Sequence, residues 1–200
     1  MLILKEENLY MKKMYTFCVI LMFALSCKPD REFETPEETA PVGGANNIMT
    51  GTIRVNEFVT VGSMYGNELD SIGSTSDWLE LYNTTNDTIF FKNGEWTLTD
   101  SVGWYDKWVM PDTFISPKGF LVVWCDDMDT TITQLHASFK LSSGGEDIGL
   151  YYNKPGAARL AVDEFTYTQQ SASTSQARYP DGSTNWIVSG NPSLELPNLP

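Results

Sequence analysis

Hydrophobic and polar residues alternate in short segments from about Thr50 to the end of the chain. Each segment is rich in β-branched and aromatic residues and is bounded by Gly, Pro, Asn or Asp, and no helical period persists for more than a turn or two. Alternation of this kind indicates β-strands rather than helices. It predicts strands at residues 52–61, 78–82, 88–91, 96–99, 107–110, 120–125, 147–152, 162–167 and 183–188.

Turn-forming residues separate the predicted strands. Gly or Pro stands where a tight reversal needs a positive or a fixed φ, at residues 92–94, 117–119, 143–145, 154–156 and 180–182. With roughly 150 residues, this region is long enough to bury a core of its own. We therefore expect one all-β sandwich domain over residues 50–200.

The segment 11–27 has the organisation of a secretory signal. Lys12 and Lys13 supply a positive start, residues 17–25 form an apolar run too short to span a bilayer comfortably, and Ser26 precedes Cys27. This arrangement resembles the signal of bacterial lipoproteins, in which the chain is cut before the cysteine and the thiol and new amino group of that cysteine are acylated. The resemblance implies a signal peptide at residues 1–26, with Met11 as an alternative start, and a lipid anchor on Cys27.

The residue order before Cys27 leaves a second interpretation open. Lipoprotein signals usually carry Leu three residues before the cysteine, whereas Ala24 stands there and Leu25 follows it. Cleavage by the ordinary secretory peptidase is the alternative. In both cases the chain is exported, and residues 27–49 form a charged, proline-containing tether with little to bury. With the anchor, the chain is expected at the cell envelope, at the outer membrane, on its periplasmic or its outer face.

Charge argues against one class of partner, and the cysteine content argues against a disulfide. The formal net charge is −13, and the basic residues are scattered singly, so nucleic acid is not an expected partner. Removal of the signal peptide and acylation of Cys27 leave Cys125 alone, so no intramolecular disulfide is expected. Cys125 ends an apolar run and is predicted to be a small buried hydrophobic residue.

Several sequence fragments, in order, resemble the lamin tail domain family. The first two are Ile53-Arg54-Val55-Asn56-Glu57-Phe58 and Ser76-Asp77-Trp78-Leu79-Glu80-Leu81-Tyr82-Asn83. The likeness continues at residues 96–100, 115–123, 136–142, 144–150, 162–167 and 177–182. It implies an immunoglobulin-like β-sandwich. The end of the chain, residues 191–198, departs from the family pattern, so the last turn is expected to be built differently.

The alternation of hydrophobic and polar residues in the fragment around Leu79 and Leu81 also predicts structural roles. Leu79 and Leu81 share one face of a strand and can enter the core, while Glu80 points elsewhere. Asp77, Glu80 and Asn83 are expected to cap turns or to pair with a neighbouring strand, with Arg178 as a candidate partner. A ligand role for these polar residues is the alternative.

The chain offers little for catalysis. Its one histidine, His136, has no recognisable nucleophile motif beside it, and the paired His or Cys spacings of metal enzymes are absent. We therefore expect a protein that is not an enzyme and needs no cofactor. The acidic loop that contains Asp126, Asp127 and Asp129 could supply oxygen ligands to Ca²⁺, and the alternative is a solvated loop.

The segment 103–108 crowds three aromatic residues into one predicted hairpin connection. By register with the family pattern Trp108 packs inward, which leaves Trp104 and Tyr105 near the tip. Exposed rings there could stack on a sugar or on a protein partner, and the alternative is that they fold over the sandwich edge.

Together these observations predict a non-enzymatic envelope lipoprotein that acts as a binding or scaffolding module. Its expected partners are the membrane, through the lipid, and a glycan or an envelope protein. Two alternatives stay open, a carbohydrate-binding surface lipoprotein that uses Trp104 and Tyr105, and an accessory module of an extracytoplasmic hydrolase or a weak hydrolase itself.

Overall fold

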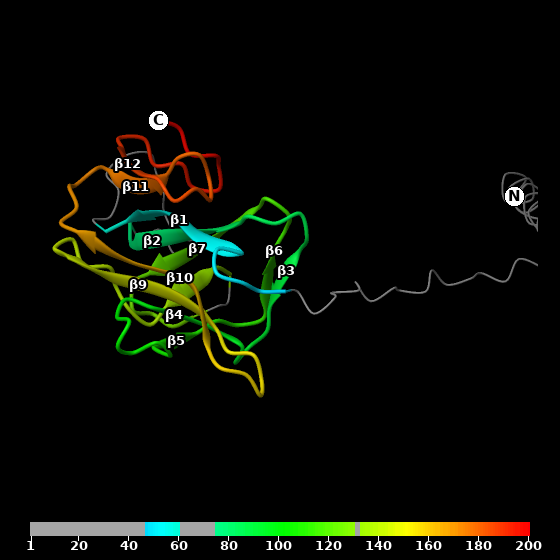
Figure 1. The fold of residues 1–200 in the computed structure, drawn as a ribbon. Coiled ribbons are helices and arrows are strands. Elements are labelled where there is room, and N and C mark those ends of the chain that lie inside the picture. Colours follow the sequence, from blue (N-terminus) through cyan, green and yellow to red (C-terminus); the bar gives the residue numbers. More distant parts are fainter. Residues whose placement is uncertain (1–46, 61–74, 131–132) are drawn as a thin grey trace, which may run out of the picture. The chain divides into compact units, whose positions relative to one another are not determined.

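A computed structural model describes residues 47–60, 75–130 and 133–200. The predicted signal peptide, Cys27 and most of the predicted tether lie outside these residues. Every regular element among the described residues is a β-strand (Figure 1). The expectation of an all-β fold is therefore confirmed.

The largest sheet contains six strands in the order β12-β11-β1-β2-β7-β8. Neighbouring strands are antiparallel except β7 and β8, which run parallel. The strands are β1 (Ile53–Val59), β2 (Asp77–Asn83), β7 (Phe120–Cys125), β8 (Leu135–Ala137), β11 (Ser175–Arg178) and β12 (Trp186–Ser189).

The second sheet is antiparallel and has the order β10-β9-β4-β5. Its strands are β4 (Trp96–Thr99), β5 (Trp108–Val109), β9 (Gly145–Tyr152) and β10 (Leu160–Thr168). A separate two-stranded ribbon pairs β3 (Ile89–Phe91) with β6 (Thr113–Ile115).

One hydrophobic core joins the two larger sheets. Val55, Leu81 and Val123 of the six-stranded sheet belong to the same buried cluster as Leu98 and Leu150 of the four-stranded sheet. In Figure 1, β1, β2 and β7 lie above β9, β10, β4 and β5. Two sheets that each bury one face against the other form a β-sandwich, as the strand pattern predicts.

Each predicted strand corresponds to an observed one, β4 and β7 with the predicted ends and the others with shifted ends, but β6, β8 and β11 were not predicted. The sequences of β8 and β11, Leu-His-Ala and Ser-Gln-Ala-Arg, contain no β-branched residue. These strands form because β7, β1 and β12 offer hydrogen-bonding edges to them. Local propensity was therefore overridden by pairing within the sheet.

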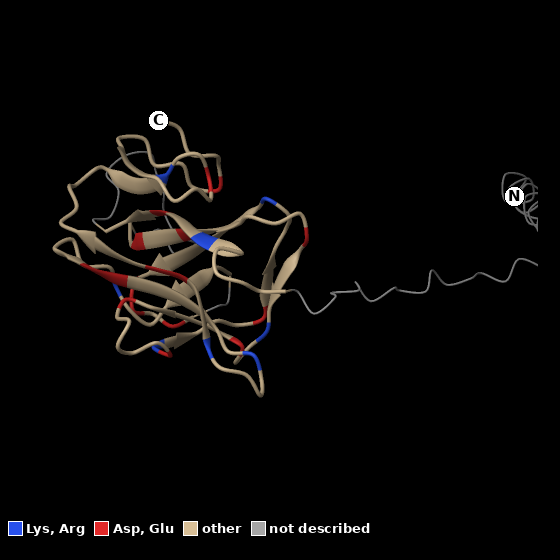
Figure 2. Ribbon diagram, viewed as in Figure 1, with Lys and Arg blue, Asp and Glu red and all other residues tan. Residues whose placement is uncertain are grey.

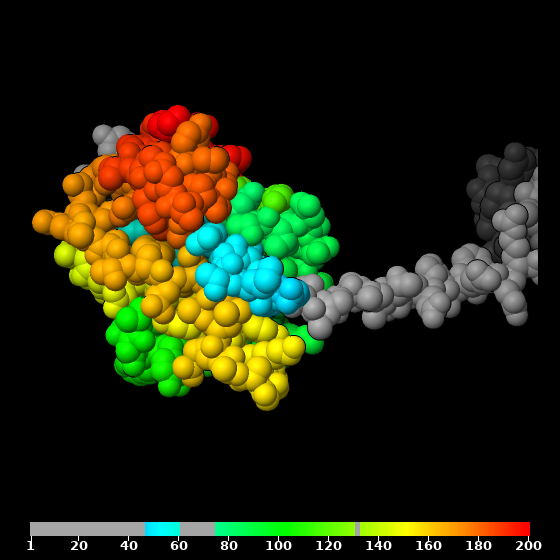
Figure 3. Space-filling model, viewed as in Figure 1, coloured from blue at the N-terminus to red at the C-terminus, as the bar shows by residue number. Residues whose placement is uncertain are grey.

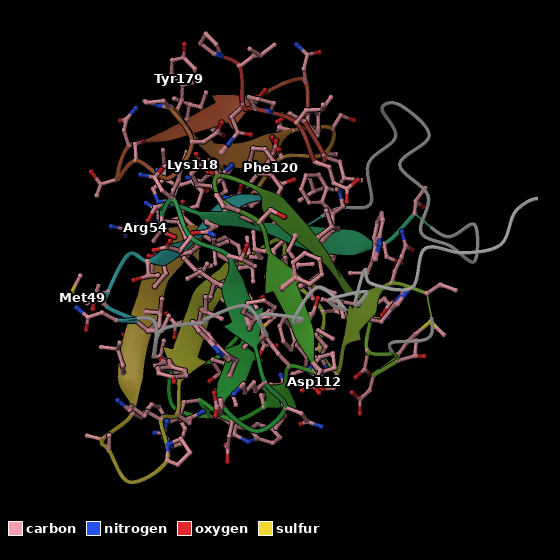
Figure 4. All side chains as sticks on the ribbon, turned by 90° about the vertical axis from the view of Figure 1, so that its right-hand side faces the viewer. Met49, Arg54, Asp112, Lys118, Phe120 and Tyr179 are labelled. Carbon is pink, nitrogen blue, oxygen red and sulfur yellow. The ribbon has the colours of Figure 1, made fainter. Side chains whose placement is uncertain are left out.

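The turn at residues 117–119 corrects one detail of the sequence interpretation. The residue with positive φ is Lys118 at 55°, not Gly119. The Lys118 ammonium donates to the carbonyl of Thr84, which ties this turn to the loop after β2. In Figure 4, Lys118 and Phe120 lie next to each other, below Tyr179.

Asn83 has the structural role expected of it. Its amide donates to the carbonyls of Asp87, Ile115 and Ser116, and its Oδ1 accepts from the backbone N–H of Thr85. Asp77 likewise accepts from the backbone N–H of Leu141.

The expected pairing of Arg178 with these residues is wrong. The Arg178 guanidinium donates to the carboxylate of Asp163 at 3.0 Å and to the carbonyl of Val55 at 2.8 Å. Asp163 lies on β10, in the other sheet, so the ion pair links the two layers. The alternation of residues along the chain does not indicate this ion pair between Arg178 and Asp163.

Replacement of Gly182 in its turn is expected to be costly. Its φ is +68°, and an added Cβ would lie 2.9 Å from the ring of Tyr82 and from Cγ2 of Thr84. We expect Gly182→Ala to lower the free energy of unfolding by about 2 to 4 kcal/mol, because backbone strain and overpacking add.

Gly94→Ala is the matched control for this prediction. Gly94 has a φ of +86°, but no heavy atom of the described residues lies within 4 Å of an added Cβ. Only backbone strain remains there, so the loss should be about 1 to 2 kcal/mol in urea unfolding. Equal losses in the two variants would contradict the packing argument for Gly182.

Candidate binding surface

The connection between β4 and β5 is held by hydroxyl groups that project from β4. Thr97 Oγ1 donates to the carbonyl of Tyr105 at 2.7 Å, and Thr99 Oγ1 donates to the carbonyl of Trp104 at 2.8 Å. The backbone N–H of Trp104 also donates to the carbonyl of Ser101 at 2.8 Å. The backbone beneath both aromatic residues is therefore fixed at several points.

Four apolar side chains of this hairpin are exposed, and we call them the hairpin patch. Trp104 is 58% and Tyr105 37% exposed. Val102 and Val109 complete the patch. The two aromatic residues thus have the exposure expected of the hairpin tip, and their ligand role stays a prediction.

Tyr105 is supported by two neighbouring side chains, Arg159 and Tyr151. The Arg159 guanidinium lies over its ring, 3.1 Å from the centroid, and Tyr151 meets it edge to face at 6.2 Å. Arg159 is itself positioned by a hydrogen bond from its Nε to Asn153 Oδ1. Because one face of the Tyr105 ring is occupied by Arg159, this side chain shapes the patch more than it offers a free stacking face.

Tyr151 is anchored in turn from β10. Its hydroxyl donates to Glu164 Oε2 at 2.5 Å, and the pKa of Tyr151 is raised by burial and by this carboxylate. An added Cβ at Gly149 would lie 2.7 Å from the Tyr151 ring, so the glycine provides the room in which that ring lies. The sheet surface beside the patch is therefore preformed.

Trp104 is the most accessible ring of the patch. Lys107 Nζ lies 5.6 Å from its ring centroid and is paired with Asp100 Oδ2 at 2.6 Å. This geometry places a cation, a carboxylate and an exposed indole within one short hairpin. An exposed indole next to charged hydrogen-bonding groups can stack on a flat ligand and fix its orientation at the same time.

Trp108 lies inward, as expected. It is 3% exposed, and its indole N–H donates to Asp129 Oδ1 at 3.0 Å. This contact joins β5 to the acidic loop that follows β7.

The structure places the three aspartates of the acidic loop in different surroundings. Asp126 Oδ2 contacts His136 Nδ1 at 2.7 Å, and its Oδ1 accepts from the backbone N–H of Met128. Asp129 accepts from Trp108, and Asp127 has a positive φ of 68°. Among the residues that the structure describes, no three His, Cys, Asp or Glu side chains are arranged to hold a metal ion.

Cys125 and His136 are both buried. Burial raises the pKa of the Cys125 thiol well above its usual range, and the carboxylates around it act in the same direction. Cys125 contributes to the lining of a cavity of about 310 Å³, together with residues that include Asp77, Asp126 and Lys140. Burial raises the pKa of Asp77 to about 7.

The distribution of charge agrees with the sequence interpretation. Figure 2 shows Lys and Arg at separate places on the ribbon, with Asp and Glu between them. Two cations, Lys107 and Arg159, lie close to the patch, and the sequence analysis did not name either of them as a binding residue. Arg159 lies more than fifty positions from Tyr105 in sequence, so only the fold brings the two together.

No protein-family model matches the chain, and no curated protein matches it. The described part of the chain contains no apolar helix of the length needed to cross a membrane. The hairpin patch therefore stands as a candidate on its geometry alone.

Proposed function

We propose that this chain is a non-enzymatic binding module held at the bacterial cell envelope, and that it binds an envelope glycan through the hairpin patch. The observation that carries the proposal is Trp104, an exposed indole on a backbone fixed by Thr97 and Thr99. Fixed exposed rings lose little conformational entropy when a ligand stacks on them, which favours binding.

The polar groups around the indole suit a sugar. Lys107 and Asp100 lie beside Trp104 and can donate to and accept from hydroxyl groups. Arg159 and Glu164 add a donor and an acceptor near Tyr105. A sugar ring presents an apolar face for stacking and hydroxyl groups at its rim, so both kinds of contact have a partner on this surface.

We propose further that the sandwich is of the immunoglobulin-like lamin tail type. In support, residues of five of the matching fragments lie in one sheet, on β1, β2, β7, β8 and β11. The fragments at residues 144–150 and 162–167 lie on the adjacent strands β9 and β10 of the other sheet. Export and a lipid on Cys27 would place the module at the envelope, with residues 27–49 as its tether.

The absence of a catalytic role is part of the proposal. His136 is 2% exposed and contacts Asp126, and Cys125 is 1% exposed. A nucleophile and a base in such positions have no access to substrate.

A glycan and envelope-polymer array with the intact chain tests the proposal. We expect binding by the wild type that is lost, by about tenfold or more, in Trp104→Ala, while the melting temperature changes by little. Phe114→Ala is the control, since Phe114 is 56% exposed but lies on the separate β3–β6 ribbon.

Three results would count against the proposal. Trp104→Ala could keep full binding, or Phe114→Ala could lose it equally. If the folded wild type bound none of the glycans, the proposal of a glycan ligand would be refuted, and an envelope protein would be the next ligand to test.

A further inference from the structure

The last residues of the chain lie across the outer face of the six-stranded sheet. We call residues 193–198 the C-terminal cover. Ser193 donates to Glu57 Oε2 from its backbone N–H at 3.0 Å and from its hydroxyl at 2.8 Å. The backbone N–H of Glu195 donates to Glu80 Oε2 at 2.5 Å. Two carboxylates of the sheet thus hold the cover.

The end of the cover is held by a third residue. Asn198 donates from its side chain to the carbonyls of Asn56 and Arg178, at 3.2 and 2.9 Å. Its backbone N–H donates to Asp181 Oδ1. In Figures 1 and 3 the C-terminal residues lie at the end of the domain next to β11 and β12.

Beneath the cover is a small apolar cluster that is separate from the main core. It consists of Val59, Trp78 and Trp124, and Leu194 of the cover packs against it. Trp78 and Trp124 are directly opposite each other on β2 and β7. Neither indole N–H has a hydrogen-bond partner among the described residues, although Trp78 and Trp124 are each at most 1% exposed.

A cavity of about 370 Å³ borders this cluster. Trp124 and Val122 of the sheet and Glu195 of the cover all contribute to its lining. The edge of the cover is therefore one wall of an existing cavity.

The two carboxylates that hold the cover are themselves close neighbours. Glu57 and Glu80 are directly opposite each other on β1 and β2, and both are fully buried. None of the ion pairs formed by the described residues includes either carboxylate. A buried, unpaired charge is costly, so two adjacent charges are unfavourable here.

The hydrogen bonds distinguish the two carboxylates. Glu57 accepts from the hydroxyl of Ser175 and from both donors of Ser193, as an ionised carboxylate does. Glu80 Oε2 accepts from the backbone N–H of Glu195, and the carboxylate also has a side-chain hydrogen bond with Asn56, but its Oε1 has no partner among the described residues. We therefore assign the negative charge to Glu57 and the proton to Glu80.

The surroundings of Glu80 also favour its protonated form. Burial raises the pKa of Glu80 to about 8, and the charges of Glu57 and Asp181 contribute to the rise. The hydrogen bonds from Glu195 and Asn56 oppose this rise, but each has a smaller effect on the pKa than burial has. The described residues therefore place no cation against Glu80 that could stabilise its charge.

We propose that the C-terminal cover is closed while Glu80 is protonated and opens when Glu80 releases its proton to solvent, which uncovers Trp78 and Trp124. Opening hydrates the Glu80 carboxylate and breaks its bond to the backbone of Glu195. It also joins the neighbouring cavity to the face that carries the two tryptophans.

The direction of the pH dependence follows from the two pKa values of Glu80. The pKa is about 8 in the closed state and near the ordinary 4.5 in the open state. The closed state is therefore fully favoured below pH 4.5. Above pH 4.5 the ratio of the closed to the open population falls by about tenfold per pH unit. This ratio levels off above about pH 8.

Amide hydrogen exchange of the intact chain between pH 5 and 9 tests the proposal. The readout is exchange of the C-terminal cover, residues 193–198, in the wild type relative to Glu80→Gln at the same pH, because intrinsic exchange rates then cancel. Gln keeps the acceptor for the Glu195 N–H without the charge. We expect the ratio to rise by up to tenfold per pH unit until about pH 8, while β1 and β2 keep their protection.

Asp77→Asn and Ser193→Ala are the control variants. Asp77 also has a raised pKa but contacts Leu141, so its variant should retain the pH dependence of the wild type. Ser193→Ala should open the cover more at every pH with the same slope, and it serves as the test if Glu80→Gln fails to fold. Equal exchange of the cover in wild type and Glu80→Gln at all pH values, or loss of cover protection only together with β1 and β2, would overturn the proposal.

Discussion

Asp163→Asn is expected to lower the free energy of unfolding by about 3 to 5 kcal/mol, because it leaves a buried guanidinium without its counter-ion. The Asp163 carboxylate is 4% exposed and accepts from Arg178 at 3.0 Å, from Arg54 at 3.0 Å and from the backbone N–H of Val55 at 2.9 Å. Asparagine has the same shape, but it lacks the charge and replaces one acceptor by a donor. The loss is measured by urea unfolding at pH 7.

Asp100→Asn is the comparison for this variant. The pair that Asp100 forms with Lys107 is more accessible, with 23% of the lysine side chain exposed. Ion pairs of that kind contribute about 0 to 1 kcal/mol. A cost for Asp163→Asn no larger than that of Asp100→Asn would show that the pair between the two sheets does not stabilise the sandwich.

Phe58→Ala is expected to cost about 3 to 5 kcal/mol, the range for removal of a buried aromatic side chain. Phe58 of β1 is fully buried, and its ring centroid lies 4.6 Å from that of Tyr167 and 5.7 Å from that of Trp186. Phe165 is a further neighbour at 5.9 Å. Truncation would leave a cavity where β1, β10 and β12 meet. We expect the near-UV circular dichroism signal of the surrounding aromatic rings to become weaker, together with the loss in free energy of unfolding.

Phe90→Ala removes the same side chain from an exposed site. Phe90 is 38% exposed and pairs with Phe114 at 6.1 Å on the β3–β6 ribbon. The expected cost is about 1 kcal/mol, the contribution of a half-exposed aromatic pair. If both phenylalanines cost the same, the cluster around Phe58 is not the packing centre that its burial indicates.

The strands with strong periodicity were predictable from the sequence, and those defined by their neighbours were not. The run from Phe120 to Cys125 was predicted to the residue because its composition alone favours a buried strand. The strand Ser175–Arg178 carries no such composition, and it forms because it pairs with β1 on one side and β12 on the other. Pairing partners distant in sequence cannot be read from a local pattern.

The same limit applies to the candidate binding surface. Trp104 and Tyr105 could be singled out because three aromatic residues crowd one turn, and their exposure followed from the hairpin. Arg159 and Tyr151 come from other strands and loops, and nothing near them in sequence connects them with Tyr105. Contacts across a sandwich depend on sheet order and register, which the alternation of residues does not determine.

The buried carboxylates show a further limit. The alternation along β2 correctly turns Glu80 away from the main core. It could not predict that Glu80 would be covered by residues 193–198, since burial on that face comes from the far end of the chain.

The most direct test of the proposed function is co-sedimentation of the intact chain with insoluble, protein-free envelope polysaccharide. The proposal predicts that the wild type and Phe114→Ala sediment with the polymer, while Trp104→Ala stays in the supernatant with an unchanged melting temperature. Sedimentation of Trp104→Ala to the same extent as the wild type, or failure of the folded wild type to sediment, would contradict binding of an envelope glycan through the hairpin patch.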